Sequence, residues 1–306
     1  MRLLDIFIRF YSCLDQKNRF GFYACARFVI RLFCNYVIPL YFVISSPFVG
    51  HRRSLPCNDI IVSLTSFPDR INRLWIVIEC LLRQRRPPAA VYLWLSSRQF
   101  HNKSLPKKLL RQQKRGLKIE FVDGDLRSHK KYYYSFQQFP DKRVVLIDDD
   151  IFYPSTLVSE LDEGWKRYDN PKIVCSYGYE MLFDETGSVL PYGDWRPLSE
   201  KEGIKNIFFG SGGGTMIQPS MLYRDVCNES LFFELCPLAD DVWLNGMAQI
   251  NNVRVIKVRK CGVILPVINN NSTNLSDDNL TGGNDTQIES MRAYYDKMGI
   301  AIYRNT

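Results

Sequence analysis

Residues 143–154 read Arg-Val-Val-Leu-Ile-Asp-Asp-Asp-Ile-Phe-Tyr-Pro, and they indicate the fold class most clearly. The apolar run Val144–Ile147 has the pattern of a strand that is buried on both faces of a parallel or mixed sheet. Asp148, Asp149 and Asp150 follow at once, and three adjacent carboxylates repel one another unless a cation lies among them. Because ligands of open α/β sheets bind beyond the carboxyl ends of the strands, the triplet predicts an Mg²⁺ or Mn²⁺ site.

A second interpretation of the triplet needs no metal. Asp150 or Ser155 could act as the N-cap of the helix that follows, because short polar side chains satisfy the free N–H groups at a helix start. The buried strand in front of the triplet favours the metal interpretation, since it places the carboxylates at the edge of a sheet.

Strands and helices alternate on both sides of this stretch. The apolar patterns predict strands at 60–64, 91–95, 117–122, 173–177 and 253–258, and helices at 71–83, 106–115 and 242–250. Strand–helix–strand order implies parallel pairing, so the predicted fold class is α/β, a mixed sheet flanked by helices. We expect a helical extension at 1–50, a linker at 51–58, a catalytic domain at 59–268, and a polar loop with a C-terminal helix at 269–306.

The N-terminal extension is hydrophobic. Its first part has apolar residues at helical spacing from Leu4 to Leu14, which predicts an amphipathic helix. Residues 32–50 carry no charge, and this run of 19 approaches the ~20 residues that cross a bilayer. Three interpretations follow: an interfacial or re-entrant membrane anchor, a true membrane span, or a helix packed on the catalytic domain.

The net charge of +8 is unevenly distributed. Residues 1–131 hold 24 Lys or Arg against 8 Asp or Glu, whereas residues 132–306 hold 16 against 24. A basic half joined to an acidic half fits a phosphorylated ligand that is held through a divalent metal, and basic residues near the N-terminus favour anionic membranes. No zinc spacing, RNP-like motif or helix-turn-helix signature is present, so we expect no nucleic-acid partner. The nine cysteines form no CxxC pair, which indicates a reducing compartment.

Two further segments carry candidate ligand-binding residues. Arg127 and Lys131 lie shortly before the acidic strand and could meet a diphosphate, or could lie on the solvated start of a helix. Gly212, Gly213 and Gly214 would let the backbone approach a ligand closely, or would mark a bulge or tight bend.

Asp240 and Asp241 form a second acidic group, directly before the predicted helix at 242–250. Carboxylates at a helix N-terminus are favourable without any function, because they complement the helix dipole. The pair is therefore a candidate only in combination with the other motifs.

Three motifs in sequence order resemble glycosyltransferases of the GT-A fold. They are Leu64-Thr65-Ser66-Phe67-Pro68-Asp69-Arg70, then Leu146-Ile147-Asp148-Asp149-Asp150, which matches the DXD motif, then Ala239-Asp240-Asp241-Val242-Trp243. They are similar to those of bacterial glycosyltransferases from capsule and lipopolysaccharide gene clusters, and more distantly to the exostosin-like C-terminal domain. The resemblance covers roughly residues 59–265.

The resemblance implies donor-binding and metal-binding roles. Thr65 and Arg70 match the strand-end region that holds the nucleotide, and Asp148 or Asp149 would contact the ribose or the metal. Asp150, with Asp148, would bind the Mn²⁺ or Mg²⁺ ion that clamps the donor diphosphate. Arg127 and Lys131 would also contact the donor.

The later motifs would complete the site. Gly212, Gly213 and Gly214 would border the sugar pocket, and Asp241, beside Asp240, matches the usual base of inverting members of the family. Trp195 and Trp243 could stack on sugar rings or lie in the core. The family often supplies a late His as a metal ligand, but His51, His101 and His129 all precede the triplet.

The expected function is therefore metal-dependent transfer of a sugar from a nucleotide-sugar donor to a glycan or lipid-linked acceptor, in surface polysaccharide biosynthesis. We expect the cytoplasmic face of a bacterial inner membrane, although Asn-x-Ser/Thr triplets at Asn271, Asn274 and Asn279 would suit a Golgi lumen. The alternatives are a non-catalytic nucleotide-sugar-binding or glycan-binding membrane protein and a metal-dependent nucleotidyltransferase or phosphotransferase.

Overall fold

The computed structural model describes residues 2–14, 21–46, 57–101, 104–167, 172–198, 206–259, 264–268 and 283–305. The expected linker falls mostly outside this part of the chain, as does most of the polar loop with the Asn-x-Ser/Thr triplets at Asn271, Asn274 and Asn279.

A mixed sheet organises the described residues. Its seven strands follow the order β10-β5-β9-β4-β1-β2-β3. All neighbours pair in parallel except β9, which runs antiparallel between β4 and β5. A smaller antiparallel sheet has the order β7-β6-β8. The strands are β1 Cys57–Thr65, β2 Pro88–Ser96, β3 Leu117–Val122, β4 Arg143–Ile147, β5 Lys172–Cys175, β6 Gly178–Glu180, β7 Arg196–Pro197, β8 Ile207–Phe209, β9 Gly213–Ile217 and β10 Arg254–Lys257.

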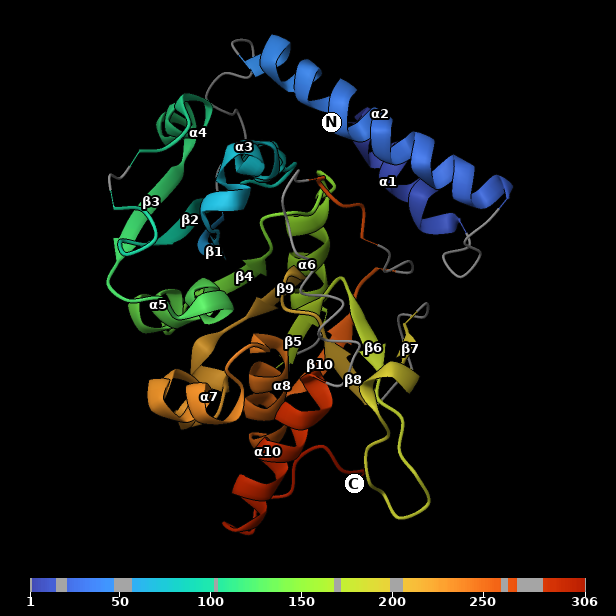
Figure 1. Ribbon diagram of the computed structural model, residues 1–306, viewed down its shortest axis with the longest axis vertical. Coiled ribbons are helices and arrows are strands. Elements are labelled where there is room, and N and C mark those ends of the chain that lie inside the picture. Colours follow the sequence, from blue (N-terminus) through green and yellow to red (C-terminus); the bar gives the residue numbers. More distant parts are fainter. Residues whose placement is uncertain are drawn as a thin grey trace.

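Helices pack on both faces of the large sheet (Figure 1). One face carries α1, α2, α3, α4 and α6, and the other carries α5, α7, α8 and α10. The helices are α1 Arg2–Cys13, α2 Phe22–Ser45, α3 Pro68–Leu82, α4 Lys107–Gln112, α5 Lys130–Gln138, α6 Leu157–Lys166, α7 Glu229–Leu235, α8 Asp240–Ile250 and α10 Asn284–Asp296.

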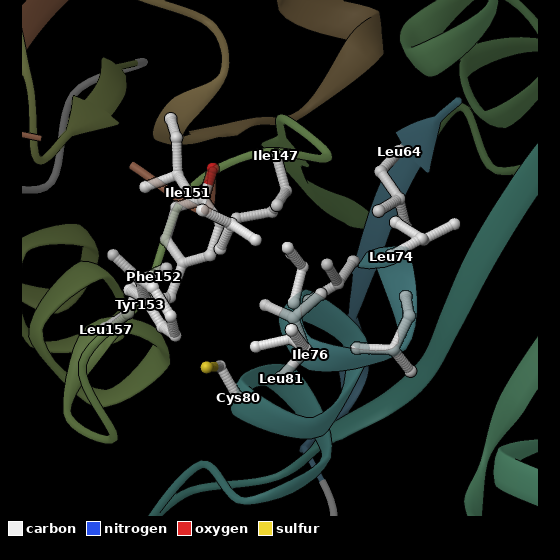
Figure 2. Close-up of a cluster of buried hydrophobic side chains, with 14 of the residues drawn as sticks. Leu64, Leu74, Ile76, Cys80, Leu81, Ile147, Ile151, Phe152, Tyr153 and Leu157 are labelled. Carbon is white, nitrogen blue, oxygen red and sulfur yellow. The ribbon is translucent and has the colours of Figure 1, made fainter. Parts of the chain in front are cut away.

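Strand β4 divides its side chains between the two faces, as a central strand must. Val145 and Ile147 enter the first core, whereas Val144 and Leu146 enter the second. In Figure 2, Leu74 and Leu81 from α3 lie in the same cluster as Ile147 and the residues that follow β4. The predicted α/β fold with a mixed sheet flanked by helices is thus confirmed.

Local chemistry fixes several boundaries. Pro68 occupies the first turn of α3, where its missing N–H costs nothing and its fixed φ suits a helix. Gly116, with φ 110°, ends the helical segment that begins with α4, because this left-handed conformation suits glycine best. β3 then begins at Leu117.

The N-terminal helices α1 and α2 pack on the first face and share its core. α2 begins at Phe22, ten residues before the uncharged run at 32–50, so that Arg27 and Arg31 lie inside the helix. Pro39 also lies within α2 and does not end it. By length and composition α2 could cross a membrane. Its inner face, with Cys34 and Ile38, is nevertheless buried in the core.

Candidate active site

The acidic triplet lies directly beyond β4, at the edge where the parallel strands end. The backbone N–H of Asp148 donates to Tyr153 Oη at 2.9 Å and to the Gly212 carbonyl at 3.1 Å. Helix α6 begins at Leu157 with Thr156 as its N-cap residue, and no side chain caps it. Ser155 instead bonds Asp5 of α1 through its backbone N–H and its hydroxyl, at 2.7 and 2.6 Å. The capping interpretation of the triplet is therefore wrong.

Arg70 of α3 holds the last two carboxylates of the triplet. Its Nη1 lies 2.9 Å from Asp149 Oδ1 and 2.8 Å from Asp150 Oδ2, and Ser66 Oγ donates to Asp149 Oδ2 at 2.6 Å. Burial raises the pKa of Asp149 even though Arg70 and Ser66 oppose the rise. Burial and the neighbouring Asp148 raise the pKa of Asp150 to about 7. One guanidinium therefore does not neutralise this cluster.

Lys131 joins the triplet to the second acidic group. Its buried Nζ lies 2.9 Å from Asp148 Oδ1 and 2.9 Å from Asp240 Oδ2. Burial alone would lower the pKa of Lys131, but Asp148, Asp240 and Asp241 outweigh it and raise that pKa. Arg127 is exposed, and its side chain donates to the Pro237 carbonyl at 3.4 Å. Of the two predicted phosphate contacts, only Lys131 lies with the acidic residues.

Asp240 and Asp241 begin α8 and share one partner, Ser211. The Ser211 hydroxyl donates to Asp240 Oδ2 at 2.7 Å, and its backbone N–H donates to Asp241 Oδ1 at 2.8 Å. Burial would raise the pKa of Asp240, but Lys131 and other partners lower it overall. Burial and the charge of Asp240 raise the pKa of Asp241 to about 7. Asp241 is thus a carboxylate able to exchange a proton near neutral pH.

The glycine run returns the chain to the triplet. A Cβ on Gly212 would lie 1.7 Å from Asp148 Oδ2, so that only glycine leaves room for this carboxylate. At Gly213 a Cβ would lie 2.5 Å from the Tyr177 side chain. Gly214 has φ 99° and packs against Leu157. The ladder between β4 and β9 shifts register here, which agrees with the bulge interpretation.

Several polar contacts in this region could not be chosen from the sequence. Thr65 Oγ1 donates to the Trp94 carbonyl at 2.8 Å, and it is the neighbouring Ser66 that reaches the triplet. Ser211 and Tyr153 also bond the acidic residues, and the sequence pattern does not indicate either contact. Their signals were weak: Ser66 follows a strand end, Ser211 precedes the glycines, and Tyr153 follows the triplet.

Trp195 and Trp243 belong to the core, which resolves the two interpretations of these residues. Trp195 Nε1 donates to the Leu190 carbonyl at 2.9 Å, and Trp243 Nε1 donates to the Val226 carbonyl at 2.9 Å. Both side chains are buried, so neither offers a stacking surface to a sugar.

The carboxylates of the triplet are the candidate ligands of a divalent cation. Within the described residues no three His, Cys, Asp or Glu side chains form a complete metal cluster. Asp148 and Asp150 are the accessible carboxylates of the triplet, with 42% and 32% of their side chains exposed. Mg²⁺ is commonly held by one or two carboxylates together with substrate phosphates and water. Two accessible carboxylates, and a glycine that makes room for one of them, fit such an ion.

Comparisons with known proteins give structural likenesses only. No protein-family model matches the chain, and no curated protein matches it.

Three solved structures illustrate the likeness. A mannosyltransferase from Pyrobaculum calidifontis, in complex with GDP-Man and Mn²⁺, has a TM-score of 0.47 at 9% identity over 90% of this chain and 77% of that one. Glucosyl-3-phosphoglycerate synthase from Mycobacterium tuberculosis has 0.44 at 13%, over 80% and 82%. A 4-diphosphocytidyl-2C-methyl-D-erythritol synthase from Anaerococcus prevotii has 0.43 at 14%, over 74% and 95%. At these scores and identities the likenesses carry no argument about activity, and the function is argued from the site.

Proposed function

We propose that this protein is a glycosyltransferase that moves a sugar from a nucleotide-sugar donor to a glycan or lipid-linked acceptor with the help of a divalent cation. One observation carries the proposal: Lys131 joins Asp148 of the triplet to Asp240 of the second acidic group. Five carboxylates and two cationic side chains, Arg70 and Lys131, meet at the carboxyl edge of the sheet. The excess of negative charge favours a cation there.

Each charged group would have a separate task. Asp148 and Asp150 would hold Mn²⁺ or Mg²⁺, which supplies Lewis-acid neutralisation of the leaving nucleoside diphosphate. Arg70 holds the side chains of Asp149 and Asp150. Lys131 keeps Asp240 ionised and adds positive charge beside Asp148.

Asp241 would act as the general base. With a pKa of about 7, its carboxylate can accept the proton of an acceptor hydroxyl as that oxygen attacks the anomeric carbon. The acceptor oxygen then forms a bond to the sugar, and the bond from the sugar to the diphosphate breaks. The proton remains on Asp241 until it exchanges with solvent.

A double-label experiment tests this function against its alternatives. The full chain with Mn²⁺ is incubated with nucleotide sugars labelled on the sugar or on the β-phosphate, and with membrane lipid or glycan acceptors. We expect the sugar label to reach the acceptor and the phosphate label to remain on the released nucleotide. Transfer of both labels together would indicate a phosphotransferase that moves the sugar phosphate, and release of both labels together as free sugar phosphate would indicate a nucleotidyltransferase. Binding without transfer to any acceptor would indicate a non-catalytic binding protein.

The cellular setting forms part of the proposal. A lipid-linked acceptor in surface polysaccharide synthesis, reached from the cytoplasmic face of a bacterial inner membrane, suits a chain whose N-terminal helices expose an apolar face. The other setting is a Golgi lumen. Protease protection in sealed membrane vesicles tests this point: digestion of the catalytic domain from the cytosolic side supports the first setting, and protection supports the second.

A further inference from the structure

The exposed apolar residues of the protein are concentrated on α1 and α2. Of the 17 large apolar side chains that are exposed in the described part of the chain, 14 belong to these two helices. They are Leu3, Ile6, Phe10, Phe22, Tyr23, Phe28, Val29, Leu32, Tyr36, Val37, Leu40, Tyr41, Val43 and Ile44. We call this set the apolar face. Contiguous apolar surface of this kind marks an interaction site on a soluble domain.

The opposite side of the same helices is hydrogen-bonded to the catalytic domain. Asp5 of α1 bonds Ser155, and Asn35 of α2 bonds the backbone of residues 266–268. Arg73 of α3 donates to the Asn35 carbonyl at 2.8 Å, and Arg83, directly after α3, donates to Ser45 Oγ at 2.9 Å. Figure 1 shows α1 and α2 side by side along one end of the molecule, beyond α3.

These hydrogen bonds limit the orientation that the two helices can take in a bilayer. If α2 crossed the membrane, Arg73, Arg83 and the backbone of residues 266–268 would be drawn into the hydrocarbon. Burial of such charged and polar groups in lipid is strongly unfavourable. A helix that lies in the membrane plane keeps those contacts and still buries its outer side chains.

The charge pattern selects the lipid. Arg9 and Arg31 are exposed and Arg27 is half-buried, whereas Asp5, the acidic residue of α1, is buried against Ser155. No acidic residue occurs in α2. Basic side chains beside an apolar helix surface favour anionic headgroups.

We propose that the apolar face of α1 and α2 binds an anionic lipid bilayer, and that both helices then lie parallel to the membrane plane. This deepens the proposed function by naming the surface from which a lipid-linked acceptor would be reached. Vesicle binding requires no sugar transfer, so the two proposals can fail separately.

Vesicle flotation of the full chain tests membrane binding through the apolar face. We expect binding to vesicles that contain phosphatidylglycerol, and at least tenfold weaker binding to pure phosphatidylcholine. The double variant Tyr36→Glu/Leu40→Glu should lose binding, whereas Leu110→Glu, at an exposed apolar position of α4, should retain it. Thermal melting of each variant checks the fold. Membrane binding through the apolar face is refuted if the double variant keeps both binding and fold. It is also refuted if the chain forms a stable dimer that does not bind vesicles.

Depth measurement separates an in-plane helix from a span. Fluorophores are attached at Phe22→Cys and Ile44→Cys, near the two ends of α2, after the exposed Cys13 and Cys25 are replaced by serine. Both labels should be quenched at the same shallow depth by nitroxide lipids in the outer leaflet. Labels on opposite sides of the bilayer would overturn the in-plane arrangement.

A separate observation concerns Asn35. Its side-chain amide donates to the Pro266 carbonyl at 3.0 Å and accepts from the Ile268 N–H at 2.8 Å. Between these two residues, the Val267 N–H donates to the backbone carbonyl of Asp150 at 2.6 Å. The segment 264–268 therefore lies between the apolar helix α2 and the metal-binding end of the triplet.

The geometry points to Asn35 as a positioning residue for Asp150, acting through this segment. Calorimetry of Mn²⁺ binding in the presence of a nucleoside diphosphate tests the role, which rests on the proposed metal site. Asn35→Ala should weaken Mn²⁺ binding about tenfold, as loss of a supporting contact around a metal site commonly does.

Ser45→Ala is the control, because it also loosens α2, by removing a contact with Arg83, but does not touch the segment. It should leave the Mn²⁺ affinity unchanged. Equal weakening by the two variants would show that Asn35 acts only by docking α2. Failure of the unsubstituted chain to bind Mn²⁺ would overturn the proposed metal site, and the role of Asn35 with it.

Discussion

The triplet beyond β4 and the pair at the start of α8 both bring carboxylates close together, but cationic side chains compensate the two groups to different degrees. In the triplet, Arg70 is shared between Asp149 and Asp150, and the pKa of both carboxyls is raised. In the pair, Lys131 lies against Asp240 and lowers its pKa, whereas that of Asp241 rises to about 7. The pair therefore contains one firmly ionised carboxylate and one that can exchange protons, whereas the triplet remains short of positive charge.

This difference assigns different chemistry to the two regions. A cluster that lacks positive charge and is partly exposed favours a cation from solution, which suits Asp148 and Asp150. A half-buried carboxylate poised near neutral pH favours proton transfer, which suits Asp241. If the comparison is correct, substitutions in the two regions will change different measured quantities.

The largest expected effect follows replacement of the proton-exchanging carboxylate. Asp241→Asn should reduce kcat about 10³-fold, within the range for loss of a general base, and should leave Mn²⁺ affinity unchanged. Because the base must be ionised, kcat of the unsubstituted protein should fall about tenfold per pH unit below about 7. The residual activity of the variant should lose this dependence.

Measurement of kcat from pH 5.5 to 8.5 at saturating Mn²⁺ and donor tests this, because a bound cation removes the titration of Asp150 from the range. Asp296→Asn, at the end of α10, is the control and should behave as the unsubstituted protein does. A variant at Asp241 that keeps more than a tenth of the rate and the same pH profile would exclude the base role.

The second prediction compares two neighbours within the triplet. Asp149 is buried and bonded to Arg70 and Ser66, so Asp149→Asn should cost about 3 kcal/mol of unfolding free energy, as for a broken buried ion pair. Asp150 is partly exposed, so that water screens its ion pair with Arg70. Asp150→Asn should therefore change stability by less than about 1 kcal/mol while it weakens Mn²⁺ binding.

Urea denaturation of both variants at pH 8 provides the measurement, with Mn²⁺ omitted so that metal binding does not contribute. Equal destabilisation by the two substitutions would mean that Arg70 depends on both carboxylates for structure. The proposed division between a supporting and a metal-binding aspartate would then be wrong.

Local patterns predicted the fold well because its elements are strongly periodic. The unbroken apolar run Val144–Ile147 predicts the buried strand that is observed, and Gly116 marks the end of a helical segment where φ is positive. The reversed direction of β9 was beyond such reasoning, since pairing partners are set by contacts far apart in sequence. The uncharged run alone does not predict the start of α2, because the helix also contains the charged residues Arg27 and Arg31.

The candidate site shows the same division between local and long-range information. The triplet and the Asp240–Asp241 pair could be predicted as acidic groups, because adjacent carboxylates are visible in the sequence. Their connection through Lys131 and their hydroxyl partners Ser66 and Ser211 could not, since these contacts join residues 17 to 109 positions apart. Many lysines and serines in the chain have similar local surroundings.

The smallest effect tests the surroundings of the Asp240 side of the comparison. His129 is buried between the Tyr132 hydroxyl, at 3.0 Å, and the Cys236 carbonyl, at 2.7 Å. Burial lowers its pKa to about 4, aided by Lys131 and Arg127 and opposed by Asp240. An unfolded histidine titrates near 6.5, so the neutral ring stabilises the fold above that pH, and this contribution is lost as pH falls from 6.5 towards 4. At pH 5 the loss should be about 2 kcal/mol.

The difference in unfolding free energy between pH 7.5 and pH 5 should shrink by that amount in His129→Gln and stay unchanged in His101→Gln, because His101 is exposed. An identical pH dependence in both variants would mean that His129 is charged in the folded protein, and that Asp240 has a second cationic partner besides Lys131.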